Sequence, residues 1–532
     1  MPSKKTRLVN LDALIPRADF ETTEDISQSS PPSTIQIRDL ERASSFFFGT
    51  LRKPDFQRET ASWEPEKVRD FIKTFIEGDL IPAIILWRSP GGTFIIDGAH
   101  RLSALIAWVD NDFGDGTVST EFFGGIIPDD QRKFAEQARK IIHKEFRTYQ
   151  EHLAALKSPD TANPEVKARA FAFGQRAIQL QWVPGNALKA ESSFFKINRS
   201  ATLIQETELE ILVARRKPNG LAARAMLRAG RGYKYWQHFA ENKQKQIEES
   251  ARHIYDQLWT PILTVPIKTL DLPVAGANYS AYTLPLLFQF ISLANEETLL
   301  HKKITTKDIE SPNGEVDKDG DATIEHLRKV RKIADRISSK DYPGSLGLHP
   351  AIYFYSDEGR FQPTAFLAVV RLITQFEKED LFADFTTHRK RFEEFLVKYK
   401  TFSNQVTAKW GSGIKSFDKF HDLLRLVLDH MIQGDTDDEI VQYLSTDPVF
   451  LFLSARDEIL LEEEIGKDFN VATQSKAFLK IALSGAIRCA HCRGYLDKKF
   501  SIDHKIPKKE GGKGHLENAQ LMHLYCNTTA KN

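Results

Sequence analysis

Between residues 63 and 109 the spacing of hydrophobic positions changes from one period to another. The stretch WEPEKVRDFIKTFIEGD predicts a helix that ends near Gly78, because its apolar residues recur at helical spacing: Val68, Phe71, Ile72 and Phe75. LIPAIILWR and TFIID then predict two strands, joined by the turn SPGG. GAHRLSALIAWV predicts a second helix directly after the strand. The pattern therefore indicates a helix–strand–turn–strand–helix unit.

Most of the remaining chain has a helical pattern. FGDG and the following thirty residues resemble an insertion with a charged helix at 131–156. Amphipathic or buried helices are predicted between 204 and 465, and the clearest segments lie at 282–295, 366–382, 392–402 and 420–432. A connecting helix at 473–487 leads into the C-terminal tail. The sequence thus predicts an α+β multidomain protein with a mostly helical middle.

The first forty residues differ from the rest in composition. They are polar, and the stretch TTEDISQSSPPST is rich in Ser, Thr and Pro, which indicates a flexible arm. We expect four parts along the chain: an arm at 1–40, an α+β domain at 41–215, a helical domain at 216–470 and a C-terminal module at 471–532.

The composition excludes several classes of protein. A hydrophobic fraction of 41% with 27% charged residues is ordinary for a globular protein. We expect a cytoplasmic protein without a membrane segment, because no run of about 18 apolar residues occurs and the start lacks the apolar region of a secretory signal. The net charge of +1 hides a basic tail, in which nine Lys and Arg oppose four Asp and Glu between 485 and 532. Such an excess suits phosphate binding, although charge alone would better fit a solvated basic surface.

All three cysteines lie in this tail. Cys489 and Cys492 form a C-x-x-C pair, and the segment HLYC offers His523 and Cys526 at the same spacing. Three cysteines cannot form a paired disulfide framework, whereas thiolates and imidazole suit tetrahedral zinc. A module of about 45 residues is too small to bury an adequate core, so a metal staple is expected. The sequence predicts a closed, structural zinc site.

The residues between the two ligand pairs extend this interpretation. In order along the chain stand CAHC, DHKIP, GG, the Asn of ENAQLM and the final YCN, and together they resemble an HNH endonuclease of the ββα-metal type. The resemblance covers Cys489 to Asn532 and implies metal-dependent hydrolysis of phosphodiesters. The family usually carries Cys-x-x-Cys as its second zinc pair, whereas His523 takes the first of those positions here.

The residue types suit this chemistry. Phosphodiester cleavage needs a base that activates water and a divalent cation at the scissile phosphate. We expect His504 to be the base and Asp503 to be an oxygen ligand of Mg²⁺ or Mn²⁺. The resemblance implies that Asn527 is a second ligand and that Asn518 braces the loop that orients the base. Contacts with the DNA backbone are expected from Lys498, Lys499, Lys508, Lys509 and Lys513.

A second resemblance covers roughly 45 to 215. FQRETASW, IIDGAHRLSALIAW and FFKINRSATLIQETELEIL resemble three segments of the GmrSD-type restriction domain, which is related to the ParB and sulfiredoxin fold. Its DGQQR segment is implicated in nucleotide binding and hydrolysis, but Ala99 and His100 replace its two glutamines here. A strand that feeds directly into a helix also offers an anion site at the helix start. We expect a nucleotide or phosphate site formed by Asp97, Gly98, His100, Arg101, Gln57 and Arg58.

The resemblances imply a bacterial-type DNA endonuclease for defence against phage or foreign DNA, in which an N-terminal domain senses a nucleotide or modified DNA. Three alternatives stay open: a ParB-like regulator that binds DNA without cutting it, an HNH enzyme that acts on RNA, and a buried ion pair of Asp97 with Arg101 in place of a ligand site. Self-association into a homo-oligomer also stays open.

Overall fold

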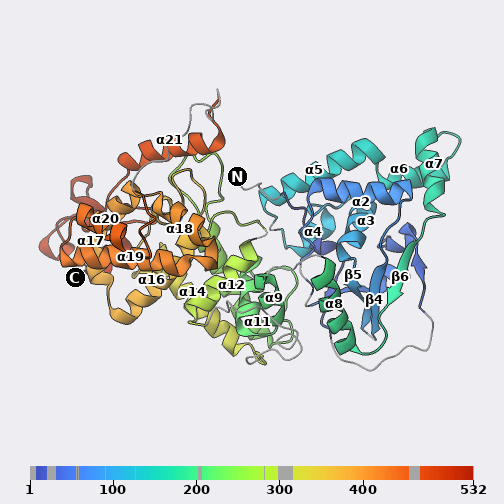
Figure 1. Cartoon of the computed structure of the whole chain (residues 1–532), viewed down its shortest axis with the longest axis horizontal. Helices are drawn as coiled ribbons and strands as arrows, with labels where there is room; N and C mark the ends of the chain where they lie inside the picture. The colour runs from blue at the N-terminus through green and yellow to red at the C-terminus, as the bar shows by residue number, and fades with distance from the viewer. Residues whose placement is uncertain are drawn as a thin grey trace. The chain divides into compact units, whose positions relative to one another are not determined.

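The computed structural model describes residues 7–20, 31–55, 57, 59–89, 91–125, 127–201, 206–280, 282–297, 316–454 and 468–530. The chain folds as two compact units (Figure 1). The first unit contains Met1–Ala240, Tyr279–Pro285 and His301–Asp319, and the second contains Glu241–Asn278, Leu286–Leu300 and Gly320–Asn532. These limits do not coincide with the boundaries expected at 215 and 470. The expected mixture of helices and strands is confirmed.

A mixed sheet organises the first unit. Its strands, in spatial order, are β1 (Arg17–Ala18), β3 (Leu51–Pro54), β5 (Gly92–Asp97), β4 (Ile84–Ser89), β6 (Ile178–Trp182) and β2 (Thr34–Ile35). β4 and β5 form the antiparallel hairpin that the sequence predicts, and parallel strands flank it on each side, β3 beside β5 and β6 beside β4. Asp97, the last residue of β5, lies at the end of this central hairpin.

Helices cover both faces of the sheet. Strand side chains alternate between the two faces, and both faces carry apolar side chains that need cover. Ile95 faces one hydrophobic core, whereas Phe94 and Ile96 face the other. Figure 1 shows the helices over the first face, which are α2 (Pro65–Glu77), α3 (Ala99–Asp110), α5 (Asp129–Phe146), α6 (Tyr149–Lys157) and α7 (Pro164–Phe173). The second face packs against α8 (Ala187–Ala201) and α9 (Glu206–Val213). The unit also contains η1 (Asp12–Leu14), η2 (Ile37–Leu40), α1 (Phe46–Thr50), α4 (Thr117–Phe122) and α10 (Pro218–Leu227).

The boundaries of the two predicted helices follow from local sequence. Helix α2 begins with Pro65 at its first position and ends at Gly78, whose φ of 81° is the left-handed conformation that glycine adopts without strain. Helix α3 follows β5 after one residue, Gly98, at a φ of 100°. A Cβ at Gly98 would also lie 2.5 Å from Ile84 Cδ1, so the turn needs glycine for two reasons.

Two segments pack more closely than their sequences indicate. The helix expected in an insertion is α5, and it buries Ala135, Ala138 and Ile142 in the core beside α2. Its charged residues occupy only the outer face. Residues 7–20 and 31–40, which we expected in a flexible arm, contribute Val9, Leu14 and other side chains to the same core. The expectation of an arm over residues 1–40 came from the polar stretch at 22–34, and it was wrong for the apolar residues on either side of that stretch.

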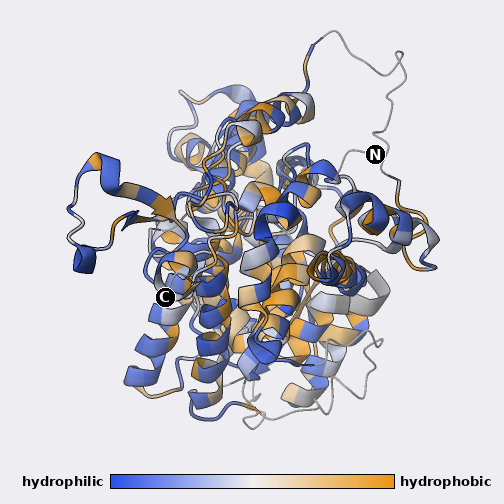
Figure 2. Ribbon diagram, turned by 90° about the vertical axis from the view of Figure 1, so that its left-hand side faces the viewer, coloured by the Kyte–Doolittle hydropathy of each residue, from blue (hydrophilic) through white to orange (hydrophobic). Residues whose placement is uncertain are grey.

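The second unit is a set of packed helices, as expected from the periodicity. They are α11 (Glu241–Trp259), α12 (Thr283–Ala294, which starts within the first unit), α14 (Asp321–Ile337), α15 (Pro350–Tyr353), α16 (Pro363–Glu379), α17 (Phe382–Lys398), α18 (Phe402–Trp410), η3 (Gly413–Lys415), α19 (Phe417–Gln433), α20 (Asp437–Thr446) and α21 (Val471–Ser484). Figure 2 shows hydrophilic and hydrophobic residues mixed along the helices, as amphipathic packing requires. Within the described ranges, none of the helices combines the length and the apolar character needed to cross a membrane.

The C-terminal module belongs to this same unit. Strands β7 (Ser501–His504) and β8 (Ala519–Met522) form an antiparallel hairpin. The loop between them contains the short turns η5 (Lys508–Glu510) and η6 (Leu516–Asn518), and the π-helical turn η7 (Cys526–Ala530) follows β8.

Candidate functional site

The four predicted zinc ligands converge at one point. Their ligand atoms all lie within 4.8 Å of one another, and all four residues are buried: Cys489, Cys492, His523 and Cys526. His523 Nδ1 lies 3.3 Å from Cys492 Sγ and 3.8 Å from Cys526 Sγ. A tetrahedral zinc with bonds of about 2.0–2.3 Å would separate its ligand atoms by roughly 3.5–3.8 Å. The cluster therefore fits a structural zinc ion.

Local backbone geometry sets the ligands in place. The first pair lies on a tight turn, in which the Cys489 amide donates to Gly494 O and the Gly494 amide donates to Cys492 Sγ at 3.4 Å. Arg493 adopts the left-handed conformation in this turn, with a φ of 60°. His523 Nε2 donates to Tyr495 O at 2.9 Å, which fixes the tautomer and leaves Nδ1 directed at the thiols.

The thiols perturb one another. Hydrogen bonds from Cys492 and Cys526 lower the pKa of Cys489, whereas hydrogen bonds to Cys489 and Cys492 raise the pKa of Cys526. The opposite directions have one cause, because the cluster holds one negative charge readily and further thiolates repel one another. A divalent cation among the three sulfurs removes that repulsion, so the electrostatics also favour a metal.

Of the expected catalytic residues, Asp503 and His504 lie on β7 of the hairpin, Asn518 lies in η6 and Asn527 lies in η7. Asp503 on β7 pairs with Gln520 on β8, and Gln520 Nε2 donates to Asp503 Oδ2 at 3.0 Å. Asn527 Nδ2 donates to Ser501 Oγ at 3.2 Å. Since Ser501 and Asp503 are two residues apart on one strand, they share a face of the hairpin, and Asn527 lies on that side. The two predicted oxygen ligands therefore come from separate elements to the same side.

Gln520 is a residue that the sequence analysis missed. Its side chain also approaches His504 O at 3.4 Å, so one amide contacts both members of the Asp–His pair. A signal was present in the sequence, since Gln520 is the one polar side chain of the strand AQLM and a polar cross-strand partner suits Asp503. A Cβ at Gly514 would lie 4.0 Å from His504 Nε2, so the glycine-rich loop approaches the imidazole.

Asn518 braces the loop between the strands. It is buried, accepts a hydrogen bond from the Ile506 amide at 2.7 Å, and donates to Ile506 O at 3.2 Å and Lys513 O at 2.9 Å. The adjacent glycines serve different purposes: Gly511 has a φ of 86° with open space around it, whereas a Cβ at Gly512 would lie 1.8 Å from Ile506 O. The hydrogen bonds of Asn518 and the close approach of Gly512 to Ile506 thus hold the loop in one conformation.

The five lysines expected at DNA fall into two groups. Lys508, Lys509 and Lys513 are exposed along the loop. Lys498 instead pairs with Asp271 at 2.7 Å, and Lys499 donates to Gln257 Oε1 at 2.8 Å and Ser338 O at 3.1 Å. Burial lowers the pKa of Lys499. In this structure the second group contacts the helical part of the unit, and a DNA role for Lys498 and Lys499 stays a prediction.

In the first unit, Arg101 contacts protein groups. Its guanidinium donates to Asp97 and to Pro82 O, and it approaches Ala83 O at 3.3 Å. Burial lowers the pKa of Arg101, whose side chain is 13% exposed. This contact is the one expected for the ion-pair alternative. It occupies part of the guanidinium, and a phosphate role for Asp97, Gly98 and Arg101 stays a prediction.

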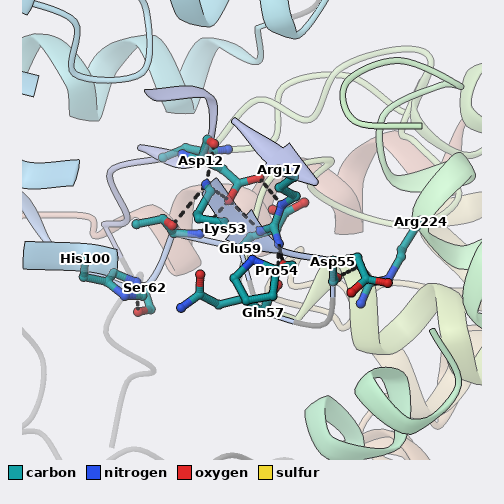
Figure 3. A network of polar contacts seen from close by, with 12 residues as sticks. Asp12, Arg17, Lys53, Pro54, Asp55, Gln57, Glu59, Ser62, His100 and Arg224 are labelled. Atoms are coloured by element: carbon teal, nitrogen blue, oxygen red, sulfur yellow. Dashed lines mark hydrogen bonds and ion pairs between the residues drawn. The ribbon is translucent and has the colours of Figure 1, made fainter. Parts of the chain in front are cut away.

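The other predicted residues of this site are His100, Gln57 and Arg58, and their surroundings differ. His100 Nε2 lies 2.7 Å from Ser62 Oγ, and its ring stacks on Trp63 with centroids 5.5 Å apart. Gln57 is buried, and among the described residues its Oε1 has no hydrogen-bond partner (Figure 3). Arg58 lies outside the described residues.

A buried network beside Gln57 was not expected from the sequence. Asp12 Oδ1 accepts from both Arg17 and Lys53 at 2.7 Å, and Arg17 also donates to Gln57 O at 2.6 Å (Figure 3). Burial lowers the pKa of Lys53 to about 8. Burial alone would raise the pKa of Asp12, but Arg17 and Lys53 together hold it well below its usual value. The ion pairs thus tie the start of the chain to β3, which precedes Gln57.

The comparisons with known proteins agree with this geometry. No curated protein and no solved structure gives a significant match. The HNH endonuclease family matches residues 489–532, which contain the zinc cluster and the hairpin. This match supports a nuclease that hydrolyses phosphodiesters, with DNA as the substrate that restriction endonuclease domains imply. The family described as GmrSD restriction endonuclease, N-terminal domain, matches residues 40–309, about half of the chain. The chain therefore belongs to the GmrSD restriction endonuclease family and carries an HNH endonuclease module at its C-terminal end.

Proposed function

We propose that the C-terminal module cuts or nicks DNA with His504 as the general base. The observation that supports this proposal is the arrangement at the end of the hairpin, where Asp503 and His504 close β7 and Asn518, in η6, braces the adjoining loop. His504 takes the proton from the attacking water. Asn518 holds the loop that borders His504, and Gln520 fixes the carboxylate of Asp503.

Asp503 and Asn527 each have a side-chain oxygen that can bind a metal ion, and both lie on one side of the hairpin. Oxygen ligands suit Mg²⁺ or Mn²⁺. Such a cation supplies charge stabilisation for the scissile phosphate and the leaving oxygen. The exposed lysines of the loop hold the DNA backbone in place, and they carry no sequence information by themselves.

We further propose that the N-terminal domain binds a nucleotide or a modified base and thereby regulates cleavage in defence against phage. Among the described residues, the buried Gln57 Oε1 has no hydrogen-bond partner, which supports a ligand there, because a buried carbonyl is costly unless something pairs with it. The start of α3 at Gly98 adds backbone amides that favour an anion.

Plasmid nicking tests the first proposal. Wild type should nick or cut DNA only with Mg²⁺ or Mn²⁺, and His504→Ala should lose cleavage while it retains DNA binding, because the base acts in the transition state. His515→Ala is a matched control on the same loop. Cleavage by His504→Ala at the wild-type rate would refute the mechanism. Digestion of RNA but not DNA, or binding without cleavage, would favour the RNA enzyme or the regulator.

Calorimetry with ATP, GTP, CTP and UTP, with and without modified phage DNA, tests the second proposal. Gln57→Leu should weaken ligand binding and leave the fold intact, since it removes a carbonyl oxygen, Oε1, that has no hydrogen-bond partner among the described residues. Arg101→Ala should also weaken ligand binding if its guanidinium binds the phosphate. If the wild type binds no nucleotide and no modified DNA, the N-terminal site is structural.

A further inference from the structure

The zinc cluster lies against helix α17. Two residues of this helix, Arg389 and Glu393, form an ion pair at 2.8 Å whose side chains are 1% and 0% exposed. A buried ion pair needs several further hydrogen bonds to offset its loss of hydration. The partners of this pair come from the segment before α15, from α15 itself and from Tyr495, which follows the first zinc turn.

Glu393 connects the helix to a zinc ligand in two hydrogen bonds. The Tyr495 amide donates to Glu393 Oε2 at 2.6 Å, and the carbonyl of the same residue, Tyr495, accepts from His523 Nε2 at 2.9 Å. Glu393 Oε1 accepts from Tyr353 on α15 at 2.9 Å. The carboxylate therefore holds the peptide that sets the orientation of the His523 ring.

Arg389 fills the remaining space between the helix and the cluster. It donates to Leu346 O at 2.5 Å and to Gly347 O at 3.1 Å. A Cβ at Gly347 would lie 3.1 Å from His523 Cδ2, and a Cβ at Gly494 would lie 2.7 Å from Arg389 Nε. Glycine at both positions allows the guanidinium and the zinc turn to approach this closely.

The charges are complementary. Three thiolates and one zinc ion carry a net charge of −1, so a buried cation beside them is favourable. Although burial would lower the pKa of Arg389, Glu393 and the sulfurs of Cys492 and Cys526 hold it above its usual value. Arg389 thus faces negative groups from its own helix and from the cluster.

More contacts join the module to the helical part around this pair. Ser338 donates to Asp497 at 2.6 Å, the Tyr525 amide donates to Ser345 O at 2.9 Å, and Thr528 donates to Pro343 O at 2.8 Å. Lys499 and Lys498 add the contacts described above. The hairpin that carries Asp503 follows directly after these anchored residues.

We propose that Arg389 and Glu393 are positioning residues for the zinc site, which join zinc binding and the docking of the nuclease module on α17 into one equilibrium. The module holds zinc at its full affinity only when it is docked, and zinc in turn orders α17 around the pair. The inference rests on the proposed structural zinc and not on the proposed cleavage.

The release of zinc from the full chain to a coloured chelator tests whether the docked pair supports zinc binding. Arg389→Met should release zinc about 10-fold faster than wild type, because it leaves Glu393, which holds the Tyr495 peptide bonded to His523, without its ion-pair partner. Arg389→Lys should restore part of the retention. Arg425→Met is the matched control, because Arg425 pairs with Asp429 four residues along α19. Wild-type release from folded Arg389→Met would overturn the proposal.

Two measurements do not depend on that variant. In Co²⁺-substituted protein, Gly494→Ala should shift the thiolate–cobalt absorption bands, since its Cβ would lie 2.7 Å from Arg389 Nε and 2.9 Å from Glu393 Oε2 and would displace both side chains without removing their charges. Removal of zinc from wild type should raise amide hydrogen exchange in 389–395 of α17 and leave α19 unchanged. Unaltered exchange in α17 would overturn the linkage. His504→Ala should behave as wild type in all of these assays, so a failure of the proposed cleavage is recognised separately.

Discussion

Gly512→Ala tests whether the loop on the hairpin must be braced for cleavage. The new Cβ would lie 1.8 Å from Ile506 O, whereas ordinary contact begins at 3.4 Å, so the backbones must separate by 1.6 Å. This displacement breaks or lengthens the three hydrogen bonds of Asn518 to Ile506 and Lys513. At about 1 kcal/mol each, the local cost is about 3 kcal/mol.

The effect on cleavage should be about as large as the local cost in free energy, since a 100-fold loss of rate corresponds to about 2.7 kcal/mol. A misplacement of about 1 Å near a reacting group lowers rates by about 100-fold, and the loop borders His504. The thermal midpoint of the helical unit and the zinc content should stay at their wild-type values, because the loop lies outside the cores of buried side chains. Plasmid nicking rates, thermal unfolding and metal analysis measure these three quantities.

The neighbouring glycine supplies the matched control. Gly511 has a φ of 86° and open space around it, and asparagine tolerates this conformation. Gly511→Asn should therefore nick at nearly the wild-type rate, whereas Gly512→Asn should be as impaired as Gly512→Ala. Equal activity of Gly512→Ala and wild type would show that the brace has no part in catalysis.

Three further perturbations have defined outcomes. Cys526→Ser should lower the zinc content from about one ion per chain and expose the tail to protease, because metal binding energy is folding energy in such modules; unchanged zinc would refute the ligand set. Burial lowers the pKa of Lys400 to about 7 from the ordinary 10.5. Between about pH 7 and pH 10.5 the unfolded chain therefore holds a proton that the folded chain lacks, so the free energy of unfolding rises with pH in this range. Urea unfolding at several pH values measures this rise. Lys400→Met should reduce its slope by up to about 1.4 kcal/mol per pH unit. Replacing Lys508, Lys509 and Lys513 by Gln should reduce the slope of log K against log salt for DNA by roughly 2.7; an unchanged slope would exclude them from the interface.

Local signals explain what the sequence predicted correctly. The hairpin of β4 and β5 and helix α3 follow from hydrophobic period and turn residues within about thirty positions. The convergence of Cys489 and Cys526 follows from ligand spacing, which is itself a local property at each end. Both predictions depend only on residues that are close together in the sequence.

Long-range packing explains what the sequence did not predict. Lys498 and Lys499 stand in a basic tail, and only the fold shows that Asp271 and Gln257 lie beside them. Nothing in the sequence around Arg389 indicates that a zinc turn covers it. Charged residues in contact across more than one hundred positions leave no periodic pattern.

The network around Asp12 has a consequence for where the first unit can be cut. The family match begins at residue 40, but Asp12 is the shared acceptor for Arg17 and Lys53, and Lys53 is fully buried. A fragment trimmed to the matched residues would leave the Lys53 ammonium inside the protein without its carboxylate, at a cost of about 3–5 kcal/mol. It would also uncover the core that Val9 and Leu14 close. Fragments of this unit therefore need to retain the chain from residue 7 onward to remain folded.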